Sequence, residues 1–180
     1  MEYLRGKFGI PIVAMEPAVR PAKAQAGQKK VLVMATQATL SLTRYRGRIE
    51  ELHMQQQVLS LPCPRLVMLV ERGITKGPEA RAEVERLFQP YRGEDVGVVV
   101  LGCTHFVHMK DTIAQVVQDT WPQAEVMDGN LGTARWLKHV LEETELLNPQ
   151  EEEGSLAFYT SYEQGGMMDV FRRLMEREEA

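Results

Sequence analysis

Residues 96–101, Val-Gly-Val-Val-Val-Leu, form a short run rich in β-branched residues, and this run leads directly into Gly-Cys-Thr-His at 102–105. So short and apolar a run predicts a strand buried on both faces, as in the parallel sheets of α/β proteins. Apolar residues at helical spacing follow between 109 and 117, which predicts a helix after the strand. Because ligands bind beyond the carboxyl ends of such strands, we expect Cys103 to lie at a functional site.

Three interpretations of Cys103 are open. A free cysteine is often a small buried hydrophobic residue. Against that, Gly102 permits close approach of backbone or ligand, and His105 stands two residues away, as reactive thiols require. A metal site of Cys103, His105 and His108 is the third interpretation, but the remaining cysteine and histidines lack the paired spacing typical of zinc ligands. We therefore favour a reactive thiol and expect no metal.

Composition excludes several classes of protein. With 180 residues and 44% hydrophobic content, the chain is long enough for one or two domains with a real core. A net charge of -4 gives no general attraction to nucleic acid or to an anionic membrane. The sequence has no apolar stretch of membrane-spanning length, and residues 1–9 lack the apolar core of a signal peptide. Two distant cysteines then favour free thiols and a cytoplasmic location.

Strand and helix patterns alternate along residues 10–128. Strands are expected at 10–15, 31–36, 58–61, 96–101 and 125–128, and helices at 41–56 and 78–89. A further helix is expected after a connecting turn at 103–105 and extends to about 120. Residues 17–26 predict a short helix or a turn, and residues 66–70 fit either a strand or a helix. This alternation predicts a Rossmann-like α/β sandwich, with a parallel sheet and helices on both of its faces.

The chain changes character after Asp128. We expect a helix at about 130–144, a polar linker at 148–154 whose glutamates form a solvated loop, a single strand at 156–160 and a last helix at about 167–176. Two glycines at 129 and 132 are better read as a helix start than as a phosphate-binding turn. One strand with two helices does not form its own core, so this segment needs a larger sheet to join.

Four segments resemble, in the same order, motifs of the aspartate/glutamate racemase family, and in particular of bacterial glutamate racemases. They are Ile-Pro-Ile-Val-Ala-Met-Glu-Pro-Ala at 10–18, Ala-Thr-Gln-Ala-Thr-Leu at 35–40, Cys-Pro-Arg-Leu-Val-Met-Leu-Val-Glu-Arg-Gly at 63–73 and Leu-Gly-Cys-Thr-His-Phe at 101–106, with further matches at 128–129 and 158–160. The resemblance extends from about residue 8 to residue 173, and four ordered motifs are more specific than any one of them.

The resemblance implies a cofactor-independent isomerase that interconverts L- and D-glutamate and supplies D-glutamate for peptidoglycan synthesis. Inversion at Cα requires an acid/base group on each face of the substrate. A thiol suits this chemistry because a helix N-terminus or a nearby cation lowers its pKa toward neutrality. On this interpretation Cys103 is the acid/base group for one face, Thr104 binds substrate, and His105 tunes or relays the proton and contacts substrate.

Three further residues take roles from the same resemblance. Thr36 and Thr39 would hold a carboxylate or the ammonium group of the substrate, and Glu71 would pair with His105 or with the substrate ammonium. Structural alternatives exist for all three. The two threonines also fit a simple helix cap, and Glu71 also fits an exposed acidic residue at the end of its segment.

The chain also departs from the family pattern. The resemblance implies a first α/β domain with an Asp-Ser-Gly-type loop and a first catalytic cysteine, and this sequence contains neither. Cys63 lies in the Cys-Pro segment and does not replace that cysteine, while Val107 stands where a proline is usual. We therefore expect residues 1–9 to be a helix remnant or linker, 10–128 a central racemase domain, and 129–180 a segment that completes a truncated second domain.

These departures predict weak or absent racemisation by the isolated chain, because one thiol cannot serve both faces of a substrate. Exposed apolar surface after Asp128 would then favour a homo-oligomer, or a missing N-terminal half as partner. Two alternatives stay open: a decarboxylase or isomerase relative that needs a single cysteine, and a non-catalytic racemase fragment.

Overall fold

The computed structural model describes residues 2–149, 154–155, 157, 159 and 166–175. Its elements are, in chain order, α1 (Glu2–Lys7), α2 (Val19–Ala26), β1 (Lys30–Ala35), α3 (Gln37–Ser41), α4 (Thr43–Glu51), β2 (Val58–Pro62), α5 (Pro64–Glu71), α6 (Pro78–Phe88), a 3-10 turn η1 (Gln89–Tyr91), β3 (Val96–Leu101), α7 (Thr104–Val107), α8 (Lys110–Thr120), β4 (Glu125–Asp128), α9 (Asn130–Glu143) and α10 (Gly166–Met175). Among these residues, no helix is long and apolar enough to cross a membrane.

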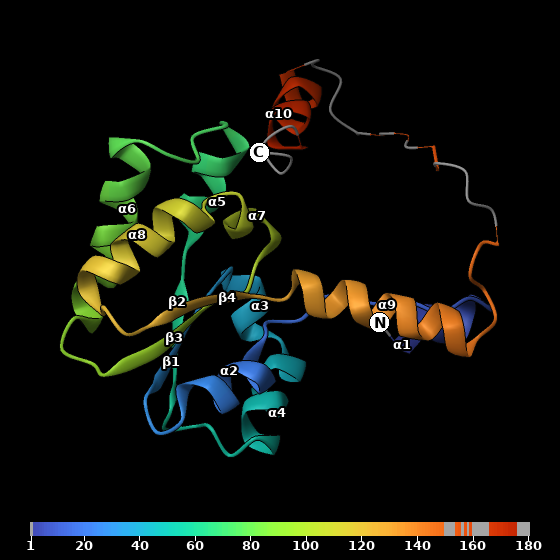
Figure 1. The fold of residues 1–180 in the computed structure, drawn as a ribbon, viewed down its shortest axis with the longest axis horizontal. Helices are drawn as coiled ribbons and strands as arrows, with labels where there is room; N and C mark the ends of the chain where they lie inside the picture. The colour runs from blue at the N-terminus through green and yellow to red at the C-terminus, as the bar shows by residue number, and fades with distance from the viewer. Residues whose placement is uncertain (1, 150–153, 156, 158, 160–165, 176–180) are drawn as a thin grey trace.

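The four strands form one parallel sheet in the order β2-β1-β3-β4 (Figure 1). Every pairing is parallel, and β1 is in register with β3 so that Met34 lies beside Leu101. The two inner strands are buried along nearly their whole length because helices cover both faces of the sheet. The α/β class and the parallel sheet predicted from the sequence are thereby confirmed.

Successive side chains of the inner strands point to opposite faces of the sheet, and this divides the core into two layers. Leu32 and Met34 of β1 face one layer, in which they pack with helices α5, α6 and α8. Val31 and Val33 face the other layer, in which they pack with α2 and with Tyr45 of α4. Each strand residue therefore buries its side chain against one helix layer, which explains why the strands are apolar at successive positions.

The carboxyl edge of the sheet is closely packed at Gly102. Its N–H donates to the carbonyl oxygen of Met34 at 2.7 Å. A Cβ at this position would lie 2.9 Å from that oxygen and 3.3 Å from Cβ of Pro17. Similarly, a Cβ on Gly129 would lie 3.1 Å from the carbonyl oxygen of Glu16. The segment around Glu16 and Pro17 therefore lies across the ends of β3 and β4, where only glycine leaves it enough room.

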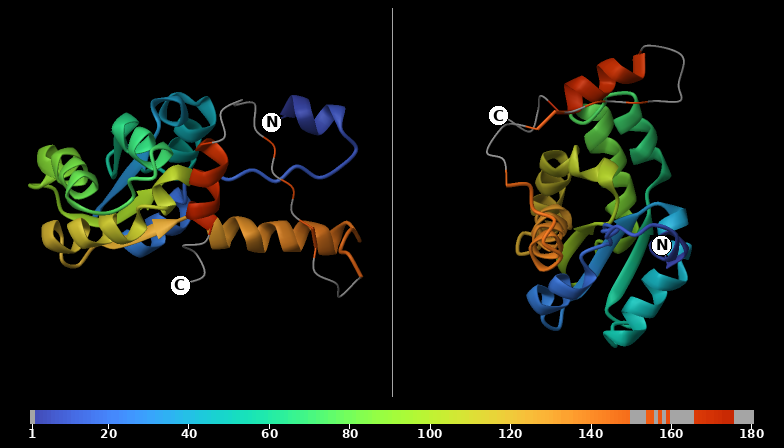
Figure 2. Two further views of the ribbon diagram at one scale, coloured as in Figure 1. Left: turned by 90° about the horizontal axis from the view of Figure 1, so that it is seen from above. Right: turned by 90° about the vertical axis from the view of Figure 1, so that its right-hand side faces the viewer.

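Two helices project from this edge of the sheet. Figure 2 shows α1 and α9 on the same side of the molecule and separated from each other. No residue of α9 is buried, and the exposed large apolar side chains include Tyr3 and Phe8 near α1 and Trp136 and Leu137 on α9. By contrast, α10 lies near the body of the molecule, where Leu174 packs against the layer that contains α5.

Several element boundaries differ from those expected. Residues 10–15 are not a strand: they lead from α1 to the crossing segment, and Ile10 is 66% exposed. The helix expected at 41–56 is the shorter α4, which ends at Glu51, and the separate helix α3 precedes it. Residues 66–70 belong to α5. The helix expected after Cys103 is divided into α7 and α8. The strand expected at 156–160 lies largely outside the described residues.

Replacing Gly102 with alanine tests this close packing. We expect Gly102→Ala to destabilise the fold by about 1–3 kcal/mol, because the new methyl group meets the Met34 carbonyl oxygen and Pro17. Urea unfolding measures the change. Gly93→Ala is the matched control, because nothing lies within 4 Å of its added Cβ. An equal effect in the two variants would contradict the packing described here.

Candidate active site

Cys103 occupies the position between β3 and α7 at which the sequence places it. It is the N-cap residue of α7, and its side chain is partly buried. Its Sγ lies 3.4 Å from Nδ1 of His105. At this separation a thiol and an imidazole are close enough to share a hydrogen bond, with donor and acceptor roles that depend on the imidazole tautomer.

His105 also faces a carboxylate on its other side. Its Nε2 lies 3.8 Å from Oε1 of Glu71, the last residue of α5. The Glu71 side chain is also 55% exposed. Its position therefore fits both interpretations, a neighbour of His105 and an exposed acidic residue. Glu71, His105 and Cys103 thus form a line of carboxylate, imidazole and thiol.

Thr36 and Thr39 lie together at the start of α3, after β1. Their hydroxyl oxygens are 3.0 Å apart, and the N–H of Thr39 donates to Oγ1 of Thr36 at 3.2 Å. Thr36 is therefore the N-cap of α3, as the structural alternative holds. Because β1 and β3 are adjacent and parallel, this threonine pair and Cys103 lie at the same edge of the sheet.

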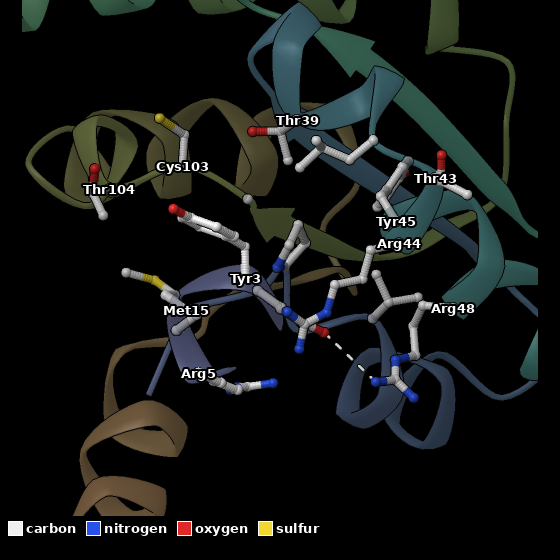
Figure 3. A pocket seen from close by; sticks show the side chains of 16 residues that line it. Tyr3, Arg5, Met15, Thr39, Thr43, Arg44, Tyr45, Arg48, Cys103 and Thr104 are labelled. Carbon is white, nitrogen blue, oxygen red and sulfur yellow. Dashed lines mark ion pairs between the residues drawn. The ribbon is translucent and has the colours of Figure 1, made fainter. Parts of the chain in front are cut away.

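A pocket of about 1060 Å³ opens beside this edge (Figure 3). Among the residues expected to act, Thr39, Cys103 and Thr104 line it. Thr36, His105 and Glu71 do not line the pocket, and they reach it only through Thr39 or Cys103. The structure therefore places three of the six residues on the wall of one cavity and the other three behind them, in contact with Thr39 or in line with Cys103.

The far side of the pocket carries charges that the sequence interpretation did not assign. Arg44 and Arg48 of α4 form ion pairs with Glu16, the latter at 3.6 Å, and Arg48 also pairs with Glu51. Tyr3 of α1 projects into the same cavity (Figure 3). The four-residue spacing of Arg44 and Arg48 places them on one face of a helix, but nothing in the sequence alone relates that face to Glu16.

Cys63 differs from Cys103 in its burial and in its contacts. It is fully buried, and its Sγ donates to the carbonyl oxygen of Leu61 at 3.2 Å. Burial raises the pKa of the Cys63 thiol to about 12. Cys63 is therefore a core residue at the end of β2, and Cys103 is the thiol that faces the pocket.

The metal site considered for Cys103, His105 and His108 finds no support in the geometry. Within residues 2–149 and the other described positions, no group of three or more histidine, cysteine, aspartate or glutamate side chains is placed to hold a metal ion.

The parallel sheet, the thiol beside an imidazole and the adjoining pocket define an α/β protein with a candidate site at a strand end. The family model for Asp/Glu/Hydantoin racemases matches residues 1–135, and the chain belongs to that family. Its relatives include the glutamate racemase of Clostridium botulinum strain Alaska E43, an amino-acid isomerase that is 34% identical over 98% of this chain and 67% of its own length.

Solved glutamate racemases share the fold. The enzyme from Thermus thermophilus, in complex with beta-chloro-D-alanine, has a TM-score of 0.72 and 26% identity over 98% of this chain and 64% of its own. The Escherichia coli enzyme, in complex with L-glutamate and the activator UDP-MurNAc-ala, has a TM-score of 0.74 and 22% identity over 97% of this chain and 65% of its own. The chain thus spans about two thirds of the length of these relatives.

The two thiols should differ sharply toward an alkylating reagent. Burial raises the pKa of the Cys63 thiol far above the pH of the reaction, and it also keeps the reagent away from the sulfur. We expect iodoacetamide to label the native chain once, at Cys103, and the urea-unfolded chain twice. Peptide mass spectrometry reads out both states. Equal labelling of the two native thiols would contradict the assignment.

Proposed function

We propose that this chain acts on glutamate as part of a cofactor-independent glutamate racemase, with Cys103 as the acid/base group for one face of Cα. The observation that carries this proposal is the alignment of Glu71, His105 and Cys103 beside a pocket that Thr39 also lines. Support also comes from the relatives, because those reported above are glutamate racemases.

The residues would divide the work as follows. Cys103 Sγ takes or gives the Cα proton, and His105 exchanges a proton with the thiol, oriented by Glu71. The hydroxyl of Thr39, fixed by its contact with Thr36, donates to a substrate carboxylate, and Thr104 contacts the substrate beside Cys103. Hydrogen bonds to the carboxylate would stabilise the negative charge that develops when the proton leaves Cα.

Inversion requires a second acid/base group on the opposite face of Cα. The chain has two cysteines, and Cys63 is buried away from the pocket. We therefore propose that the 180-residue chain exchanges the Cα proton of one enantiomer and inverts poorly or not at all. A complete racemase would need the second group from additional chain or from another molecule.

The domain arrangement belongs to the same proposal. Residues 10–128 would form the unit that carries Cys103, residues 1–9 a helix or linker beside it, and residues 129–180 a segment that contributes to a second unit. The exposed apolar side chains of α9 support this division, because a helix of a finished domain buries one face.

The biological setting follows from the product. The family resemblance implies that D-glutamate is supplied for peptidoglycan synthesis. We therefore propose that the reaction serves cell-wall synthesis and takes place in the cytoplasm. The proposed reaction requires glutamate as its small-molecule substrate and uses no cofactor.

Solvent deuterium exchange tests the proposal most specifically. In D₂O we expect the chain to incorporate deuterium at Cα of one glutamate enantiomer, with little inversion, and Cys103→Ala to lower that rate at least about 100-fold. NMR follows the loss of the Cα proton, and chiral chromatography follows inversion. Cys63→Ala is the matched control and should retain exchange.

Each other result has a definite meaning. Rapid inversion would show a second base that the proposal lacks. No exchange with either enantiomer would overturn the proposed activity of the chain and favour a non-catalytic fragment. Exchange that survives Cys103→Ala would contradict the role of this thiol.

A further inference from the structure

The chain from residue 10 to the crossing segment at Glu16 and Pro17 has little backbone support. It belongs to no helix or strand, and within the described part of the chain residues 10–16 make no hydrogen bond from backbone to backbone. Its first part is held by the side chain of Arg5, whose guanidinium donates to the carbonyl oxygen of Ile12 at 3.1 and 3.3 Å. Side-chain contacts must therefore keep this part of the chain in place.

Glu16 anchors the crossing segment to α4. Its Oε1 forms an ion pair with Nε of Arg44, and its Oε2 lies 3.6 Å from Nη2 of Arg48 (Figure 3). Oε1 is closed to solvent, and the Glu16 side chain as a whole is 29% exposed. Two guanidinium groups on one partly buried carboxylate hold it more firmly than a single exposed ion pair does. Both carboxylate oxygens of Glu16 are thus engaged by α4 and not by the open part of the cavity.

The anchored segment packs directly against the residue before Cys103. A Cβ on Gly102 would lie 3.3 Å from Cβ of Pro17, and a Cβ on Gly129 would lie 3.1 Å from the carbonyl oxygen of Glu16. Glu16, Pro17 and Cys103 also line the same pocket. Because Gly102 is bonded to Cys103, a shift of the crossing segment changes the packing of the backbone from which the thiol projects.

We propose that Glu16 is a positioning residue for Cys103. Its ion pairs with α4 hold the crossing segment against Gly102, and this contact fixes the direction from which Cys103 Sγ approaches a bound substrate. A misplacement of about 1 Å at a reacting group can cost about 100-fold in rate. The inference rests on the proposed function for its effect on catalysis, whereas its effect on the reactivity of Cys103 does not depend on any enzymatic activity.

Alkylation of the two thiols tests the positioning without the use of activity. We expect Glu16→Gln to raise the rate of the iodoacetamide reaction at Cys103 at least about 3-fold, because a released segment leaves the pocket beside the thiol more open. Cys63 is the internal reference for unfolding, since it is fully buried, and it should stay unlabelled. Glu85→Gln is the matched control, because Glu85 pairs with Arg81 at 2.7 Å and does not line the pocket.

The kinetics of deuterium exchange at Cα test the catalytic consequence. We expect Glu16→Gln to lower the turnover at saturating glutamate at least about 10-fold and to change KM less than about 3-fold, since Thr39 keeps its place on α3. A merely structural role would lower the melting temperature and leave the turnover of the folded chain unchanged. The double variant Glu16→Gln/Arg44→Gln should be no slower than Glu16→Gln, because both changes break the same ion pair.

An unchanged rate of Cys103 alkylation or an unchanged turnover in Glu16→Gln would overturn the proposal. Equal acceleration at both thiols would also overturn it, because it would report unfolding of the whole chain. Losses of turnover that add in the double variant would show that Glu16 and Arg44 act separately, which the proposal excludes. If the original chain itself exchanges no Cα proton, the proposed function fails, and the alkylation result alone decides the role of Glu16.

Discussion

The pairing of β1 with β3 determines where the chemistry of this chain lies. Because the two strands are parallel and adjacent, the loops that carry Thr39 and Cys103 leave the sheet at the same edge. The hydrogen bond from Gly102 N–H to the Met34 carbonyl oxygen extends this pairing by one residue beyond β3. The crossing segment at Glu16 and Pro17 then lies against the glycines at this edge. Backbone pairing and close backbone packing thus fix the positions of the thiol, the threonine pair and the pocket wall.

Much of this arrangement could be predicted from the sequence. The β-branched run before Cys103 identifies a buried strand, since few other elements are so short and so apolar, and its end identifies the site. Periodicity failed at residues 10–15, where an apolar segment looks like a strand but leads to the crossing segment without pairing with the sheet. It also left residues 66–70 undecided, because a short apolar run in a helix is like one in a strand.

The site itself was predictable in part. The spacing of Cys103 and His105 in the sequence already implies their contact, and the resemblance related Glu71 to His105 across two helices. The pairing of Arg44 and Arg48 with Glu16 depends on how α4 packs against the crossing segment, and no local pattern contains that information. The same limit applies to Cys63: its motif differs from that of Cys103, but its complete burial depends on the folded core.

We propose that Cys103 and Thr39 hold one substrate between them. A crystal structure of the chain with bound glutamate tests this directly. We expect a carboxylate of the ligand within hydrogen-bonding distance of the Thr39 hydroxyl and its Cα about 3.5 Å from Cys103 Sγ. Glutamate bound only at Arg44 and Arg48, with Cα remote from the thiol, would contradict it.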